Sequence, residues 1–158
     1  MGTVEAKLAT LGFKLPEPFV YPKATRRGAV RVGNLLFMSG HGVNAASDPG
    51  LRLTGKLGGD MTTEQGYAVA RAVALSMLAS IKRAIGDLDR VKQVVRLFGM
   101  VNCTPDFAQQ SLVMDGASDL FFDLFGPEAG CHARSAVGMA ALPHGMAVEI
   151  NGEFEINA

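Results

Sequence analysis

The sequence predicts an α+β domain in which one mixed β-sheet carries two helices on one face. Three observations lead to this prediction. A long segment has an apolar stripe at helical spacing, and short β-rich segments lie before and after it. The order along the chain is hairpin, helix, strand, helix, hairpin. Finally, the 158 residues contain no internal repeat and no domain boundary, so we expect one domain over residues 1–158.

A short helix and a β-hairpin are the first elements expected along the chain. Residues Glu5–Leu11 are predicted to form a helix that ends at Gly12. The proline-rich residues 14–18 then form an extended connector, because proline lacks a backbone donor. Two apolar runs, Ala29–Val32 and Leu35–Ser39, flank a Gly-Asn turn and predict the hairpin.

The strongest helix signal follows a long loop. Residues 42–61 are rich in Gly, Asn, Asp and Ser, and loops of this length are usually functional or mobile. Thr62 and Gln65 then form a capping-box pattern, which predicts a helix from Thr63 to Ile85 that stops at Gly86. Its apolar stripe consists of Val69, Val73, Met77 and Ile81.

The second half of the sequence predicts three strands and a second helix. Residues Val91–Asn102 are β-rich, helical structure restarts at residues 104–106, and Ala117–Phe125 form a helix closed by the Gly-Pro pair that follows. Residues 133–142 and 146–156 alternate in polarity and are expected to be two strands joined as a hairpin.

One face of this sheet is expected to be buried between subunits. The strands leave apolar side chains on both faces, and two helices cover only one of them. We therefore predict an oligomer. The residues on which this expectation rests are Leu36, Met38, Leu97 and Met139.

Composition and residue spacing argue against several classes of protein. Fifteen basic and fifteen acidic residues give no net charge, which disfavours nucleic-acid binding. Cys103 and Cys131 are far apart and fit free thiols in a reducing compartment. No stretch has the apolar length of a membrane span and the first residues lack a signal-peptide pattern, so a cytoplasmic protein is the expectation. No cluster has metal-ligand spacing, and we expect neither a metal nor a cofactor.

Arg134 is the most conspicuous candidate for a functional residue. It lies within a predicted strand among small residues, where an arginine needs a partner. A guanidinium binds a carboxylate or phosphate with two parallel hydrogen bonds, so Arg134 indicates an anion site. The alternative is a structural ion pair with Glu149. In the predicted hairpin Arg134 lies opposite about residue 153, too far from Glu149 for direct contact, and both interpretations remain open.

The other candidate residues are weaker. Gly40 ends a strand, where a missing side chain lets backbone N–H groups approach an anion or simply permits a bulge. His132 lies two residues before Arg134 and faces the same side, and a packing role is the expectation. His41 and His144 are isolated in sequence. Cys131 is not expected to act as a nucleophile, because the adjacent histidine faces the opposite side.

Three motifs together resemble the RidA/YjgF family, which also carries the label endoribonuclease L-PSP. They are Gly33–His41, His132–Val137, and Leu142-Pro143 leading to Val148–Ile150. The resemblance extends from about Val30 to Ile150. It is closest to a divergent branch that carries the run Asp115–Leu120 and a longer N-terminus, here residues 1–25 as an extension.

The resemblance implies a chorismate-mutase-like protomer that forms a homotrimer with ligand sites between subunits. The better-studied members of the family hydrolyse reactive 2-imino or enamine acids to 2-keto acids and ammonia without metal or cofactor. Carried over, Arg134 would bind the substrate carboxylate, assisted by the backbone N–H of Gly40. Glu149 would position or deprotonate the attacking water. The alternatives are a non-catalytic trimer that binds a small carboxylate and, less favoured, an endoribonuclease.

This chain departs from the family at three positions of the expected site. The family's aromatic residue falls near Thr25 or Arg26, which leaves Tyr21 and Phe19 as displaced candidates for that wall. Asp115 replaces an asparagine and introduces a negative charge. Ala136 replaces a cysteine, which removes a side chain but keeps the backbone carbonyl. The resemblance therefore predicts Gly40, Arg134, Asp115, Ala136 and Tyr21 as substrate-binding residues.

Overall fold

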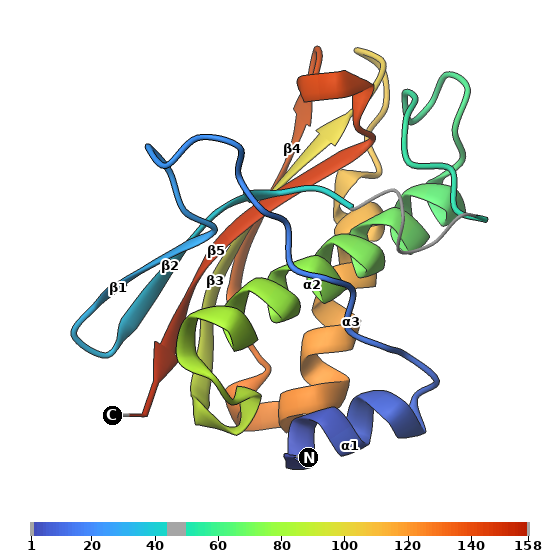
Figure 1. The fold of residues 1–158 in the computed structure, drawn as a ribbon. Coiled ribbons are helices and arrows are strands. Elements are labelled where there is room, and N and C mark those ends of the chain that lie inside the picture. Colours follow the sequence, from blue (N-terminus) through green and yellow to red (C-terminus); the bar gives the residue numbers. More distant parts are fainter. Residues whose placement is uncertain (1, 44–49, 158) are drawn as a thin grey trace.

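A computed structural model describes residues 2–43 and 50–157. They form one five-stranded sheet in the order β1-β2-β5-β3-β4, with helices packed on one face (Figure 1). The strands are β1 (Ala29–Val32), β2 (Leu35–His41), β3 (Val91–Asn102), β4 (Ala133–Met139) and β5 (Val148–Ile156). The helices are α1 (Thr3–Thr10), α2 (Thr63–Ile85) and α3 (Gln110–Ala129), with short 3-10 turns η1 (Leu88–Arg90) and η2 (Pro143–Gly145). The predicted α+β fold is confirmed.

Helix α2 follows the sequence signals closely. The Thr62 hydroxyl accepts from the backbone N–H of Gln65, and the Gln65 side chain accepts from the backbone N–H of Thr62, so the predicted capping box is present. The helix ends at Gly86, as expected. All four members of its apolar stripe are buried in the core beneath the sheet. The capping box therefore sets where this helix starts, and the stripe sets which face it buries.

The strand pairing differs from the predicted C-terminal hairpin. Strand β4 pairs in parallel with β3, and β5 lies between β2 and β3, so β4 and β5 are not neighbours. Arg134 pairs with Leu97 on β3, and its predicted position opposite residue 153 is wrong. Polarity alternation identifies a strand but not its partner. Strand β5 alternates between buried and partly buried residues, which fixes its two faces but not its neighbours in the sheet.

Helix α3 is longer than predicted. It begins at Gln110 rather than Ala117, and helical hydrogen bonding continues to Ala129 across a kink at Gly126, whose φ is 82°. Residues 104–106 form only a turn. The early start escaped prediction because the N-cap, Gln109, makes no side-chain capping hydrogen bond.

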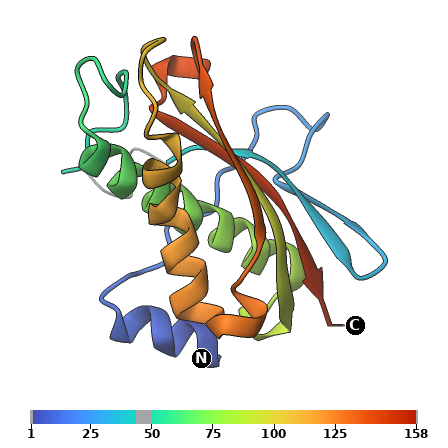
Figure 2. The same ribbon diagram turned by 180° about the vertical axis from the view of Figure 1, so that it is seen from behind.

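Helices α2 and α3 cross with their backbones almost in contact. A Cβ atom on Gly116 of α3 would lie 2.0 Å from the carbonyl oxygen of Tyr67 on α2. Beside this crossing, the Tyr67 hydroxyl donates to the Asp119 carboxylate at 2.8 Å. Both views of the ribbon show the two helices on the same side of the sheet (Figure 2). The glycine thus fixes the position of α3, and with it the polar side chains that α3 turns toward β4.

The face of the sheet away from the helices carries apolar side chains. Of the residues on which the expectation of an oligomer rests, Leu36, Met38 and Leu97 all belong to the core beneath the helices. The opposite face of the hairpin instead exposes Val30 and Phe37, which pair across β1 and β2 and are 52% and 42% exposed. That the uncovered face is buried between subunits stays a prediction.

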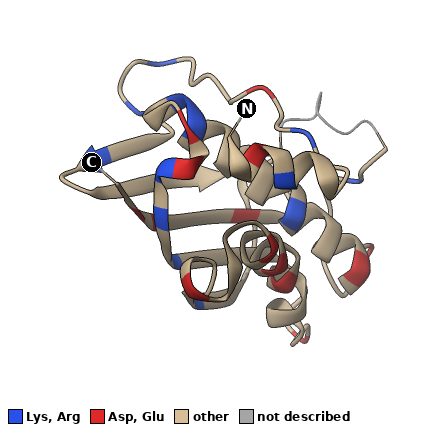
Figure 3. Ribbon diagram, turned by 90° about the horizontal axis from the view of Figure 1, so that it is seen from below, with Lys and Arg blue, Asp and Glu red and all other residues tan. Residues whose placement is uncertain are grey.

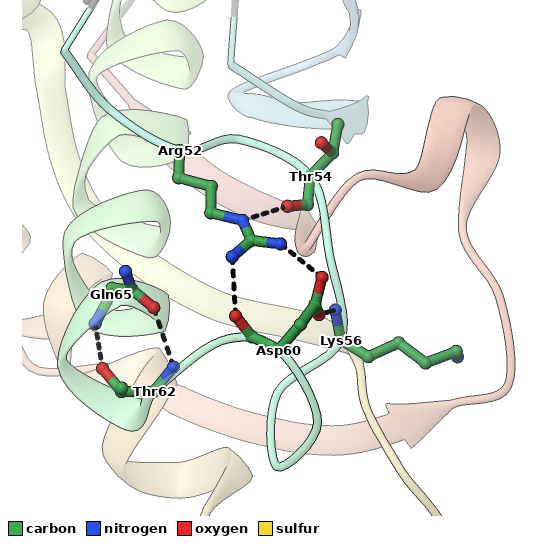
Figure 4. A network of polar contacts seen from close by, with 6 residues as sticks. All are labelled: Arg52, Thr54, Lys56, Asp60, Thr62 and Gln65. Atoms are coloured by element: carbon green, nitrogen blue, oxygen red, sulfur yellow. Dashed lines mark hydrogen bonds and ion pairs between the residues drawn. The ribbon is translucent and has the colours of Figure 1, made fainter.

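Hydrogen bonds between residues 52–60 fix the second part of the long loop before α2 begins. The Arg52 guanidinium donates to the carbonyl oxygens of Thr54 and Asp60 and contacts the Asp60 carboxylate (Figure 4). The backbone N–H of Lys56 donates to the same carboxylate at 2.7 Å and lowers the pKa of Asp60. Residues 44–49 of the predicted loop lie outside the described residues. From Arg52 onward this loop is held by specific hydrogen bonds.

Candidate functional site

The predicted site residues fall into two groups on different parts of the protomer. Tyr21, Gly40 and Glu149 line one pocket of about 350 Å³. Arg134 and Asp115 meet between the edge strand β4 and helix α3. Ala136 lies on β4 two residues after Arg134 and pairs with Gly99 of β3. We call the first group the Glu149 pocket. The Arg134 cluster comprises Arg134, Asp115, Ser118 and His132.

In the Glu149 pocket, a carboxyl group lies directly against a glycine. A Cβ atom on Gly40 would lie 2.2 Å from Oε1 of Glu149, so any other residue at position 40 would displace the carboxyl group. Burial raises the pKa of Glu149. A carboxyl group with a raised pKa accepts and releases protons closer to neutral pH, which suits general acid–base chemistry.

The N-terminal wall of the Glu149 pocket is aromatic. Phe19 and Tyr21 both line it, and their rings meet edge to face with centroids 5.0 Å apart. The Arg26 guanidinium lies over the Tyr21 ring at 5.0 Å. Burial raises the pKa of Tyr21. Phe19 and Tyr21, the displaced candidates suggested by the sequence, thus form this wall. Position 26, near which the family carries its aromatic residue, is a cationic arginine here.

His41 is a pocket residue whose role could not be read from its isolation in the sequence. It is 3% exposed, Nδ1 lies 2.6 Å from the Ser39 carbonyl oxygen, and Nε2 lies 2.9 Å from the Ser80 hydroxyl. Because a carbonyl can only accept, Nδ1 carries the proton and Nε2 accepts from Ser80. Burial lowers the pKa of His41. The imidazole therefore stays neutral and ties β2 to α2 beneath Gly40.

We expect this histidine to make the fold sensitive to acid. The unfolded chain binds a proton at His41 more readily than the folded chain does, so stability falls as the pH drops below about 6.5, by up to about 1.4 kcal/mol per pH unit. Urea unfolding between pH 7.5 and 5 should show this loss, and His41→Gln should have a flatter profile. The raised pKa of Glu149 makes the free energy of unfolding increase as the pH falls, in the opposite direction to His41. The effect of His41 is therefore read from the difference in stability between the wild type and His41→Gln. Parallel profiles would contradict the assignment.

The Arg134 cluster holds a guanidinium in a fixed orientation. Nη1 donates to the Asp115 carboxylate at 2.8 Å and to the Ser118 hydroxyl at 3.0 Å, and Nη2 donates to the Ser111 carbonyl oxygen at 3.3 Å. The Arg134 side chain is 20% exposed. Arg134 therefore has a structural partner, but this partner is Asp115 and not Glu149.

His132 completes the cluster. Its Nδ1 donates to the Gly130 carbonyl oxygen at 2.7 Å, which leaves Nε2 to accept from the Ser118 hydroxyl at 3.0 Å. Ser118 in turn accepts from Arg134. The expectation of a packing role for His132 is too narrow, because the ring orients the hydroxyl that holds the guanidinium. Asp115 and Ser118 are three residues apart and lie on one face of α3, which is the signal in the sequence that could have identified them, whereas Ser111 contributes a backbone oxygen that any residue would supply.

Within one protomer the two groups cannot act on the same small molecule. Arg134 pairs with Leu97 and Glu149 pairs with Met100 on opposite edges of β3. Three residues along the strand give roughly 10 Å, and two strand spacings add roughly 10 Å across the sheet. Leu97 faces the buried core, whereas Met100 is only partly buried and points to the opposite face by alternation. A ligand that reaches both groups must therefore bind between two protomers.

The described part of the chain contains neither a candidate metal site nor a candidate membrane-spanning helix. Among residues 2–43 and 50–157, no group of three or more His, Cys, Asp or Glu side chains could hold a metal ion. None of the described helices is long and apolar enough to cross a membrane.

Comparison with known proteins places these features in a family. Residues 5–148 match the family model described as "YjgF/chorismate mutase-like, putative endoribonuclease". Protein TCP17 of Trypanosoma cruzi is 46% identical over 156 residues, which cover 99% of this chain and 96% of that protein. The crystal structure of Atu1372 from Agrobacterium tumefaciens, a protein of unknown function, matches with a TM-score of 0.89 at 37% identity. The match covers 98% of this chain and 93% of the Atu1372 chain. The structure of a "putative endoribonuclease" from Shewanella oneidensis matches with a TM-score of 0.90 at 32% identity, and the match covers 98% of this chain and 100% of that chain.

Proposed function

The chain belongs to the YjgF/chorismate mutase-like family, and we propose that it is a hydrolytic deaminase of small 2-imino or enamine acids. Its products would be a 2-keto acid and ammonia. The site would be assembled between subunits of a homotrimer, with the Arg134 cluster of one subunit facing the Glu149 pocket of the next. The observation that carries this proposal is the division of the predicted site residues into two groups with complementary chemistry, a fixed guanidinium and a desolvated carboxyl group.

A small carboxylate fits the Arg134 cluster best. The guanidinium is held by three hydrogen bonds before any ligand arrives, so little side-chain entropy is lost on binding. Two structural relatives share the fold, and the name of one of them mentions a small carboxylate ligand. A protein named RidA from Psychrobacter has a TM-score of 0.56 at 25% identity. The structure of Escherichia coli TdcF, with a TM-score of 0.54 at 18% identity, contains bound serine, which carries a carboxylate.

The reaction then follows from placement of the imine carbon. With the substrate carboxylate held by Arg134 and by the backbone N–H of Gly40, the C=N carbon faces the Glu149 carboxyl group. A water molecule adds to this carbon while Glu149 takes its proton, and the amino nitrogen of the resulting carbinolamine receives a proton in return. Glu149 then accepts the hydroxyl proton of the carbinolamine and passes it to the amino nitrogen. The C–N bond breaks, ammonia leaves, and the hydroxyl oxygen becomes the keto oxygen. Glu149 returns to its starting protonation state.

Asp115 favours a second candidate function, a trimer that binds small carboxylates without catalysis. The Asp115 carboxylate already forms an ion pair with the Arg134 guanidinium, so the carboxylate of a ligand has to compete with it. Ala136 also lacks the thiol that the family carries there. Binding of 2-keto acids in a calorimeter without ammonia release from imino acids would favour this alternative.

Ribonuclease activity is disfavoured, since the described site offers no free pair of histidines: His41 and His132 each use both ring nitrogens in hydrogen bonds.

A subunit-mixing experiment tests the composite site. The variants Arg134→Ala and Glu149→Gln should each be inactive in ammonia release from 2-iminopropanoate generated by an amino acid oxidase. After the two are unfolded and refolded together in equal amounts, random trimers would contain both intact halves at about one site in four, and roughly a quarter of the wild-type activity should return.

Two controls accompany the mixture. Each variant is refolded alone, and the two separately refolded variants are combined without unfolding; none of these samples should regain activity. If the co-refolded mixture also stays inactive although the wild-type protein recovers under the same conditions, the site does not lie between subunits. A wild-type protein that releases no ammonia would refute the deaminase assignment itself.

A further inference from the structure

A second pocket, of about 630 Å³, lies beside the Glu149 pocket and is rich in cations. The loop before β1, strand β1 and the last turns of α2 surround it, and in Figure 1 the blue loop arches above the β1–β2 hairpin. We call it the cationic pocket. Its charged lining residues are Lys23, Arg26, Arg27, Arg31 and Arg83.

The cationic pocket has no acidic residue in its described lining. Elsewhere in the molecule, Arg52, Arg96 and Arg134 all form ion pairs with carboxylates, whereas none of the five pocket cations does so within residues 2–43 and 50–157. Figure 3 shows basic and acidic positions interspersed over the ribbon, as expected for a chain without net charge. Five like charges around one pocket repel one another, and a ligand with several negative charges would relieve this repulsion.

The remaining wall of the cationic pocket is apolar. It includes Phe19 and Val20, which are 51% and 67% exposed, together with Ala24, Val30 and Ala84. A simple inorganic anion would leave these side chains in water. A volume in the range of 300–1,000 Å³, an apolar wall and a cluster of cations together fit an organic anion. Because arginine forks bind phosphate oxygens in pairs, phosphate is the anionic group that matches four arginines best.

We propose that the cationic pocket binds an organic polyphosphate of nucleotide size, with the phosphates on its arginines and the flat organic part on Phe19 and Val20. The charge is confined to one concavity on a chain that is neutral as a whole, which argues for a small ligand rather than the extended backbone of a nucleic acid. This proposal is independent of the deaminase reaction. It has a consequence for the other site, because Phe19, Tyr21 and Arg26 line both pockets, so a ligand in one contacts the wall of the other.

Titration calorimetry with ATP and inorganic tripolyphosphate as probes tests the proposal on the full chain. ATP should bind, more weakly as salt increases, and tripolyphosphate should bind less tightly than ATP because it lacks a part that covers the apolar wall. The double variant Arg27→Gln/Arg83→Gln should bind ATP at least about tenfold more weakly, since two charge-assisted contacts are lost.

The matched control is the double variant Lys14→Gln/Arg71→Gln. It removes the same charge from the chain at two positions outside the pocket, one of them on α2 like Arg83, and its affinity for ATP should stay within about twofold of wild type. Absence of ATP binding at millimolar concentration and low salt would overturn the proposal. So would an equal loss of affinity in both double variants, which would indicate a general effect of charge. Equal affinities for ATP and tripolyphosphate would overturn the role of the apolar wall. Circular dichroism verifies that each variant is folded.

Discussion

Replacing Arg134 with alanine is expected to lower the rate of ammonia release at least about a hundredfold, because the carboxylate of the substrate loses its charge-assisted hydrogen bonds. Such contacts contribute roughly 3 kcal/mol, and the loss should appear in kcat/KM for 2-iminopropanoate. Stability should change little, since the remaining Asp115 carboxylate is 41% exposed and can be hydrated. The fold is therefore expected to persist while the activity is lost.

The conservative variant Arg134→Lys separates charge from geometry. Lysine keeps the positive charge but cannot bind Asp115, Ser118 and a carboxylate at once through a planar fork, so we expect a rate between those of the wild type and the alanine variant. Thermal unfolding of both variants controls for the fold. If Arg134→Ala releases ammonia as fast as wild type, the proposed carboxylate site is wrong.

The largest effect on stability is expected at the crossing of α2 and α3. Gly116→Ala should destabilise the protein by about 3 kcal/mol, even though alanine favours the helix over glycine by about 1 kcal/mol. The new Cβ atom would lie 2.0 Å from the backbone oxygen of Tyr67, so one helix has to move. Denaturant unfolding measures this change as a shift of the midpoint.

Gly66 provides a matched comparison within the same helix pair. A Cβ atom there would meet Leu57 Cδ1 at 2.7 Å and Val113 Cγ2 at 2.9 Å, which are side-chain atoms and not backbone atoms of the other helix. Gly66→Ala gains the same helix propensity and should cost clearly less than Gly116→Ala. Equal losses at the two positions would contradict a backbone-to-backbone contact at Gly116.

Local signals in the sequence identified most elements of the fold. The capping box and Gly86 gave both ends of α2, and the Gly-Asn turn located the β1–β2 hairpin. These predictions succeed because the determining residues are close together in the chain. The pairing of β4 with β3 could not be obtained in this way, since it depends on contacts between distant segments that leave no mark on the alternation of either strand.

The error in α3 explains why the partner of Arg134 was missed. With the helix assumed to start at Ala117, Ser111 and Asp115 lay outside any regular element, and their shared face could not be recognised. The structure starts the helix at Gln110 and places both beside Ser118 on the side of β4. The sequence offers Glu149 only as an alternative structural partner for Arg134, and in the structure β3 lies between β4, which carries Arg134, and β5, which carries Glu149.

The central position of β5 has a consequence for how the chain folds. Residues 148–156 pair with both β2 and β3, and Leu35 lies opposite Glu155, so the middle of the sheet closes only when segments from opposite ends of the sequence meet. Until then the β1–β2 hairpin leaves Leu36 and Met38 uncovered, and its inner edge lacks a partner. Such long-range closure is slow compared with helix formation. During synthesis the sheet therefore has to wait for its last strand, and until then the hairpin exposes apolar side chains that are prone to association.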